Sequence, residues 1–174
     1  ARANHNLIGM VQPQNASDTS AAPAIYGVGG VGRITHYAET QDGRNIIRLT
    51  GLCRFKISEE LQVMTPYRQI QSNWNAFSAD LAADTPATPV NRATLMAALK
   101  TYLEQKGLAA DYDGINSAPD NVLINTLSMI IPFGAPEKQA LLEAPTTTAR
   151  AEILKSLLVM TTSATLTDIT ERLS

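Results

Sequence analysis

Residues 25–57 read IYGVGGVGRITHYAETQDGRNIIRLTGLCRFKI, and this stretch decides the fold. It is rich in Val, Ile, Tyr and Thr, and residues 33–39 and 45–51 each divide into two alternating faces, as strands do. Asp42-Gly43 stands between them. This pair favours a tight two-residue turn, because Asp and Gly tolerate positive φ best. The stretch therefore predicts a β-hairpin.

Shorter strand-like segments lie on both sides of this hairpin. Residues 7–12 form a short apolar segment, and a polar loop rich in Pro, Ser and Asn follows over 13–23. Residues 61–71 are a third candidate strand, in which Pro66 indicates an edge or a bend. We therefore expect a β-rich lobe over residues 1–84.

The apolar period becomes helical after 84–89, a Pro- and Thr-containing linker that reads DTPATP. Asn91 is the expected N-cap of the first helix and Gly107 its C-terminal stop. Further helices are expected after capping-box spacings at 117–120 and 165–168, over 136–142 and over 148–160. The expected buried side chains are Leu95, Leu99, Tyr102, Leu103, Leu123, Leu127, Ile130, Ile131, Ile153, Leu154, Leu157, Leu158 and Met160. Strands followed by a helical lobe over residues 85–174 predict the α+β class.

Composition excludes several classes of protein. The chain has 174 residues, of which 44% are hydrophobic and 17% charged, a globular balance without a run apolar enough for a membrane helix. One cysteine and two histidines argue against a disulfide framework and against a metal centre. A net charge of −2 provides no basic footprint for nucleic acid. We expect a cytoplasmic protein with no cofactor, metal or membrane partner, whose chain begins inside a domain because residues 1–6 lack signal-peptide features.

Gly27 to Gly32 match the dinucleotide-binding pattern G-x-G-x-x-G. That pattern holds a pyrophosphate only where a strand meets a helix N-terminus, with an acidic residue about 20 positions later. Here the chain continues as strand, and the region about 20 positions on reads Thr50-Gly51-Leu52-Cys53. The glycines therefore indicate a bulged, closely packed strand.

Cys53 is the one candidate for a nucleophile with a histidine partner. The hairpin register brings His36 toward residue 50, and His5 is the other histidine. A Cys53–His36 hydrolase site therefore stays open beside the alternative of a small buried cysteine.

Aromatic residues gather near the expected lobe boundary: Tyr67, Trp74, Phe77 and Tyr102. Their burial between the lobes is one interpretation, and an apolar patch that grips peptide is the other. Arg68, beside Tyr67, is suited to a peptide carbonyl, a carboxylate or a surface ion pair.

Several short segments form a combination more specific than any one of them. They are Leu7-Ile8-Gly9-Met10-Val11-Gln12-Pro13, Tyr26-Gly27-Val28-Gly29, Gly32-Arg33-Ile34-Thr35, Asp42-Gly43-Arg44, Leu49-Thr50-Gly51-Leu52-Cys53-Arg54-Phe55, Pro66-Tyr67-Arg68 and Ala135-Pro136-Glu137-Lys138-Gln139-Ala140-Leu141-Leu142-Glu143. In this combination, which covers nearly the whole chain, the sequence resembles the N-terminal, substrate-binding domain of the Lon protease family.

The resemblance implies a PUA-like β lobe, a helical bundle and a role in recognising protein substrates for ATP-dependent proteolysis. The family domain starts with a further segment that includes a first strand, so the β lobe is expected to be partly truncated, with an open sheet edge. The sequence contains no G-x-x-x-x-G-K-[ST] loop and no room for a peptidase domain. We therefore expect that the chain is not an enzyme.

The leading hypothesis is a non-catalytic module that binds unfolded or exposed polypeptide, either along a sheet edge or between the lobes. Its expected peptide-binding residues are Tyr67, Arg68, Trp74 and Phe77. The alternatives are the Cys53–His36 hydrolase and, by analogy to PUA-like folds, an RNA-binding module. Self-association stays open.

Overall fold

The computed structural model describes residues 6–82 and 90–173, with the backbone alone over 164–173. The chain divides into two units, Ala1–Thr85 and Pro86–Ser174. The linker expected at 84–89, and with it the expected boundary after residue 84, lies outside the described residues. A four-stranded antiparallel sheet followed by helices confirms the predicted α+β class.

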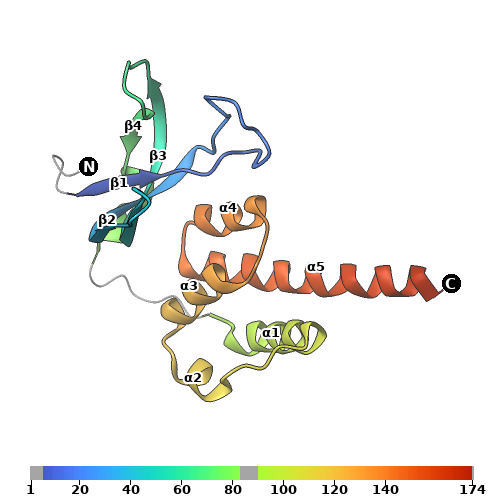
Figure 1. Cartoon of the computed structure of the whole chain (residues 1–174). Helices are drawn as coiled ribbons and strands as arrows, with labels where there is room; N and C mark the ends of the chain where they lie inside the picture. The colour runs from blue at the N-terminus through green and yellow to red at the C-terminus, as the bar shows by residue number, and fades with distance from the viewer. Residues whose placement is uncertain (1–5, 83–89, 174) are drawn as a thin grey trace. The chain divides into compact units, whose positions relative to one another are not determined.

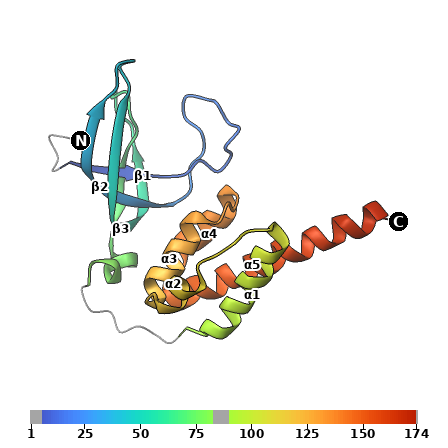
Figure 2. The same cartoon turned by 60° about the horizontal axis from the view of Figure 1, so that its bottom comes forward.

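The first unit is an antiparallel sheet with the strand order β1-β2-β3-β4 (Figures 1 and 2). Its strands are β1 (Leu7–Met10), β2 (Val28–Glu39), β3 (Asn45–Leu61) and β4 (Gln69–Asn73).

Residues 25–57 form the predicted hairpin, with two differences. Its loop has five residues, 40–44, so the expected two-residue turn is wrong. The Thr40 N–H donates to the Arg44 carbonyl oxygen across this loop, and Gly43 has φ +79°. The third candidate strand is also displaced, because β3 itself continues to Leu61 and β4 starts only at Gln69.

The glycines of β2 allow close packing, as the sequence predicts for a glycine-rich segment that continues as a strand. A Cβ on Gly29 would lie 2.6 Å from the carbonyl oxygen of Met10 and 2.8 Å from the ring of Phe55. The register between β2 and β3 shifts at Val31/Gly32, which is the predicted bulge. Phe55 takes the space above the glycines and is 2% exposed.

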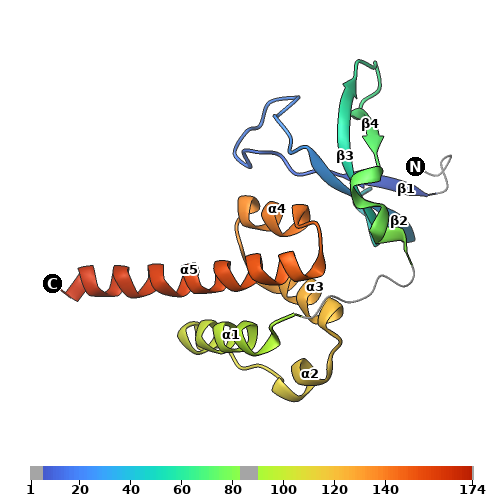
Figure 3. The ribbon, with the colours of Figure 1, turned by 180° about the vertical axis from the view of Figure 1, so that it is seen from behind.

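A short 3-10 helix, η1 (Asn75–Leu81), follows β4 and returns to β3 (Figure 3). Asp80 of η1 accepts hydrogen bonds from the Arg54 backbone N–H at 3.0 Å and from its guanidinium at 2.7 and 2.8 Å. The Arg54 guanidinium also lies 4.3 Å from the ring centre of Phe77. This partly buried ion pair anchors η1 on the sheet.

The second unit is helical (Figures 1 and 3). Asn91 caps its first helix by accepting from the Thr94 N–H, and Gly107 ends it at φ +63°, both as predicted. The helix expected over 148–160 instead runs unbroken from 147 to 173, so a separate last helix after 165–168 is wrong. The helices are α1 (Arg92–Lys106), α2 (Tyr112–Ser117), α3 (Asp120–Ile130), α4 (Ala135–Glu143) and α5 (Thr147–Leu173).

Helices α1, α3 and α4 pack on α5 around an apolar core. Ile130 and Met160, expected inside, are exposed, because the buried positions pass from Leu127 to Ile131 and, on α5, from Leu158 to Thr162. No helix among the described residues has the length and apolar character needed to cross a membrane. The core consists of Leu95, Leu99, Tyr102, Leu123, Ile124, Leu127, Ile131, Leu141, Ala151, Leu154 and Leu158.

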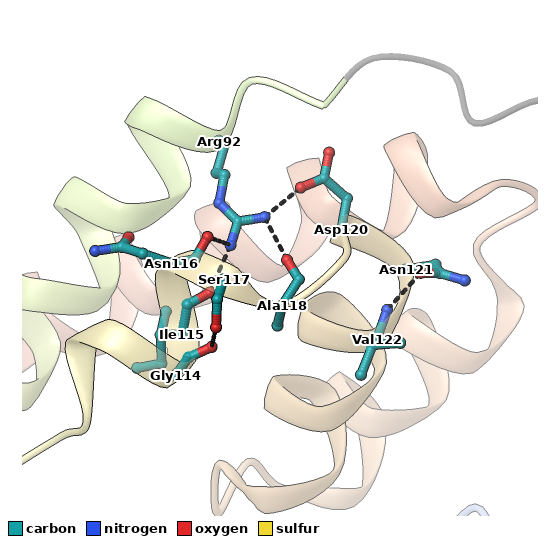
Figure 4. Close-up of polar contacts among 9 residues, drawn as sticks. All are labelled: Arg92, Gly114, Ile115, Asn116, Ser117, Ala118, Asp120, Asn121 and Val122. Carbon is teal, nitrogen blue, oxygen red and sulfur yellow. Dashed lines mark hydrogen bonds and ion pairs between the residues drawn. The ribbon is translucent and has the colours of Figure 1, made fainter.

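Arg92 joins the start of α1 to the end of α2 and the start of α3 (Figure 4). Its guanidinium donates to the carbonyl oxygens of Ile115, Asn116 and Ala118 and pairs with Asp120. The predicted capping box at 117–120 is therefore wrong. Ser117 ends α2 and donates to Gly114, while the carboxylate of Asp120 is held by Arg92.

Candidate functional site

The last residue of β3 and the turn that follows it expose four large apolar side chains within seven residues, 61–67, which we term the apolar turn. Met64 is fully exposed at 105% of its reference area, Tyr67 is 64% exposed, and Leu61 and Val63 are about two-fifths exposed. Such a cluster costs free energy in water and marks a surface that contacts another molecule more often than a single exposed residue does.

Arg68 holds the base of the apolar turn. It pairs with Glu60 of β3 through two nitrogens, one of them 2.6 Å from the carboxylate, and donates to the Pro23 carbonyl oxygen at 2.7 Å. The hydrogen bonds from Arg68 hold the pKa of Glu60 below its ordinary value. The guanidinium thus binds a carboxylate and a carbonyl, but both belong to its own chain, and it fixes the turn against the loop between β1 and β2.

The predicted aromatic set is divided by the structure. Tyr67 lies before β4 and Trp74 directly after it, so the two stand at opposite ends of that strand. Trp74 is 40% exposed and packs edge-to-face on Phe55, with ring centres 5.5 Å apart. Phe77 is 8% exposed beneath Arg54, and Tyr102 belongs to the core of the helical unit.

Strand β4 is the edge of the sheet between these aromatic residues. Its register pairs Leu61 with Gln69, Glu60 with Ile70 and Lys56 with Asn73. Among the residues that the structure describes, the backbone of Gln69–Asn73 has no partner other than β3. The sequence QIQSN also contains no charged residue and no proline.

The register between β2 and β3 contradicts the hypothesis of a Cys53–His36 hydrolase site. Cys53 lies opposite Val31, whereas His36 lies opposite Arg48, five residues further along β2 and about 17 Å away at the usual rise of a strand. Burial and the nearby Asp80 carboxylate raise the pKa of the Cys53 thiol, which disfavours the thiolate. His5 lies outside the described residues. Cys53 and His36 do not form a catalytic pair.

No group of three His, Cys, Asp or Glu side chains within the described parts of the chain is arranged to hold a metal ion. The sequence did not indicate the exposure of Leu61, Val63 and Met64, because a single strand was expected over 61–71, whereas β3 ends at Leu61 and the other two lie in the turn after it. The signal was Thr65-Pro66, which favours a turn and so turns apolar neighbours out of the sheet.

The family model of the ATP-dependent protease La (LON) substrate-binding domain matches residues 1–160 of this chain. The N-terminal domain of the Mycobacterium avium complex Lon protease is similar in fold, with a TM-score of 0.50 and 12% identity over 88% of this chain and 89% of that chain. A Lon N-terminal domain protein from Xanthomonas campestris has a TM-score of 0.51 and 14% identity over 87% of this chain and 89% of that chain. No curated protein matches the sequence.

Proposed function

The chain belongs to the family of ATP-dependent protease La (LON) substrate-binding domains, and we propose that it recognises protein substrates by binding their unfolded or exposed segments at the apolar turn. The family match confirms the resemblance seen in the sequence. Domains of this family are non-catalytic modules, and the separation of Cys53 from His36 supports the same role for this chain.

The observation that carries the proposal is the apolar turn. Unfolded polypeptides expose apolar side chains that native proteins bury, so an exposed apolar surface distinguishes the two states without reading a sequence. Met64 at its tip is unbranched and polarisable, which suits contact with many different side chains. Arg68 supports the proposal by fixing the base of the turn, so that less order must be gained on binding.

A binding titration with one denatured model protein and its native form tests the proposal. We expect the chain to bind the denatured form and not the native one. Met64→Ser should weaken the affinity about fivefold, because one apolar side chain is lost from the contact. Its matched control is Met129→Ser, which removes an exposed methionine (75%) from α3 in the helical unit and should leave the affinity unchanged.

Both substitutions are at exposed positions, so thermal unfolding should change little and any loss of affinity reports on binding. Equal affinity for denatured and native protein contradicts substrate recognition of this kind. An equal effect of the two methionine substitutions contradicts the assignment to the apolar turn. The expected absence of a nucleic-acid partner, the alternative of an RNA-binding module and the possible self-association all stay expectations from the sequence.

A further inference from the structure

We propose that a cavity in the helical unit binds the N-terminal residue of a substrate polypeptide, with the apolar side chain of that residue inside and its α-ammonium group on Glu137. The inference rests on polypeptide as the class of ligand, which the proposed function names, but not on the apolar turn. It adds a second contact, one that recognises an end of the substrate chain.

The cavity has a volume of about 480 Å³ and lies where the end of α1, the connection between α3 and α4, the first turn of α4 and α5 meet. Tyr102, Leu108 and Phe133 form its apolar lining together with Pro132. All of its lining residues belong to the helical unit and are described by the structure. A volume of this size is typical of ligand sites, and the apolar lining suits a large apolar side chain.

Glu137 is the carboxylate of the cavity and lies in the first turn of α4. Its Oε2 lies 2.6 Å from the position that a Cβ on Gly134 would take, so the carboxylate lies over the start of α4, where the helix dipole favours negative charge. The side chain is half-buried, and within the described part of the chain it has neither an ion pair nor a hydrogen bond. A carboxylate that is partly withdrawn from water gains from a cationic partner, and here a ligand supplies one.

Lys106 is the one cation among the described residues that line the cavity, and it is exposed at the end of α1. It has no ion pair with Glu137 or with any other described residue. Two opposite charges thus line one cavity without pairing with each other. An N-terminal residue complements both, because its α-ammonium group donates to Glu137 while Lys106 donates to the carbonyl oxygen of the first peptide bond.

The same charges disfavour the other parts of a polypeptide. An internal apolar residue has no cation beside its side chain, so Glu137 would lose water without gaining a charged partner. A C-terminal residue would bring a second carboxylate into a cavity that already contains one, and like charges repel. The occupant that fits is therefore an N-terminal residue with a large apolar side chain.

The test uses a five-residue peptide that starts with leucine, continues with glycine and serine, and carries a fluorescent dye at its C-terminus. Fluorescence anisotropy measures the affinity of the intact chain for three forms: one with a free α-amino group, one that is acetylated there, and one with serine in place of leucine. We expect acetylation to weaken binding at least about tenfold, because the charge-assisted contact with Glu137 is lost. Serine should also weaken binding at least about tenfold, since no large apolar side chain is buried.

The substitution Glu137→Gln assigns the contact to one carboxylate. Glutamine keeps the size of the side chain but removes its charge, so affinity for the free-amine peptide should fall about tenfold and affinity for the acetylated peptide should stay unchanged. The matched control is Glu104→Gln, which removes an exposed carboxylate from α1 outside the cavity and should change neither affinity. Far-UV circular dichroism checks that both variants stay folded.

Equal affinity for the free and the acetylated peptide, or an equal effect of Glu137→Gln on both, overturns the inference. Displacement of the dye-labelled peptide by free leucine as effectively as by the unlabelled peptide would assign the cavity to a free amino acid and overturns it as well. These outcomes leave the proposed function intact, because Met64→Ser tests the apolar turn with denatured protein and should not change the peptide affinity. An unchanged affinity of Met64→Ser for denatured protein, with the peptide results as expected, overturns the apolar turn and leaves the cavity as the substrate site.

Discussion

The two units of the chain are nearly equal in length but differ in how they are held together. Among the described residues, the helical unit buries an eleven-residue apolar cluster. The β unit buries Val28, Phe55 and Phe77 as its apolar core, and it relies besides on strand pairing and on the Arg54–Asp80 ion pair. The helical unit is thus held together mainly by its apolar core, whereas the β unit leaves many of its large apolar side chains exposed.

This difference bears on where recognition takes place. Burial of apolar area is the main source of stability, so a unit that leaves large apolar side chains outside gives up stability that its core would otherwise supply. In the β unit those side chains include the apolar turn. These exposed apolar side chains do not stabilise the free chain, so they are available for contact with a ligand.

The largest expected effect is that of Phe55→Ala. Phe55 is the most buried apolar side chain of the β unit, and its removal should cost about 4 kcal/mol, a large part of the stability of a small domain. Trp74 fluorescence follows the unfolding of the β unit, and far-UV circular dichroism follows the helices. We expect the fluorescence transition to shift strongly while the dichroism transition stays in place. A common shift of both would show that the units unfold as one.

The counterpart in the helical unit is Leu154→Ala. Leu154 is 0% exposed, and its truncation should cost about 3 kcal/mol. Many neighbouring core residues remain, so the helical unit should stay folded at 25 °C with a lower dichroism midpoint. The fluorescence transition should not move. A loss of the Trp74 fluorescence transition in this variant would show that the β unit does not unfold independently of the helical unit.

A smaller effect is expected for Gly29→Ala, matched with Gly30→Ala on the same strand. The new Cβ on Gly29 would lie 2.6 Å from a backbone oxygen, and overpacking of this kind should cost about 2 kcal/mol. At Gly30 nothing lies within 4 Å, so alanine should be neutral or stabilise by about 0.5 kcal/mol. Denaturant titrations followed by Trp74 fluorescence measure both. Equal costs would show that β1 and β2 do not approach as closely as the structure has them.

The smallest effect concerns pH. The pKa of Glu60 is lowered by its hydrogen bonds from Arg68, so the pairing contributes above the ordinary value of 4.5 and is lost as the pH falls through the lowered value. The carboxylate is exposed to solvent, so little stability is at stake. An NMR titration should place Glu60 below 4.5, and Arg68→Gln should return it toward 4.5. An unchanged midpoint in the variant would show that Arg68 does not lower the pKa of Glu60 at the base of the apolar turn.

Local patterns predicted much of the fold correctly. Asn91 and Gly107 cap α1 as expected, because capping depends on one side chain and its nearest backbone groups. Capping-box spacing failed at 117–120, where Arg92, distant in sequence, binds Asp120 instead. The failure follows from a tertiary contact that competes with a local one.

The candidate site was only partly predictable. Tyr67 and Trp74 are exposed beside β4, but Phe77 is covered by Arg54, a residue 23 positions earlier that no local pattern connects to it. The exposure of Met64 likewise depends on where β3 ends, which pairing with β4 decides. Cys53 and His36 were separated by the register of two strands.

The sequence by itself determined the α+β class, the strand character of the glycine-rich segment and the family resemblance, since these depend on period, composition and short motifs. Only the tertiary structure decided which apolar side chains lie outside and how the described strands are ordered in the sheet. Exposure and register are properties of pairs of distant segments, because a side chain is buried or left in water by what packs against it.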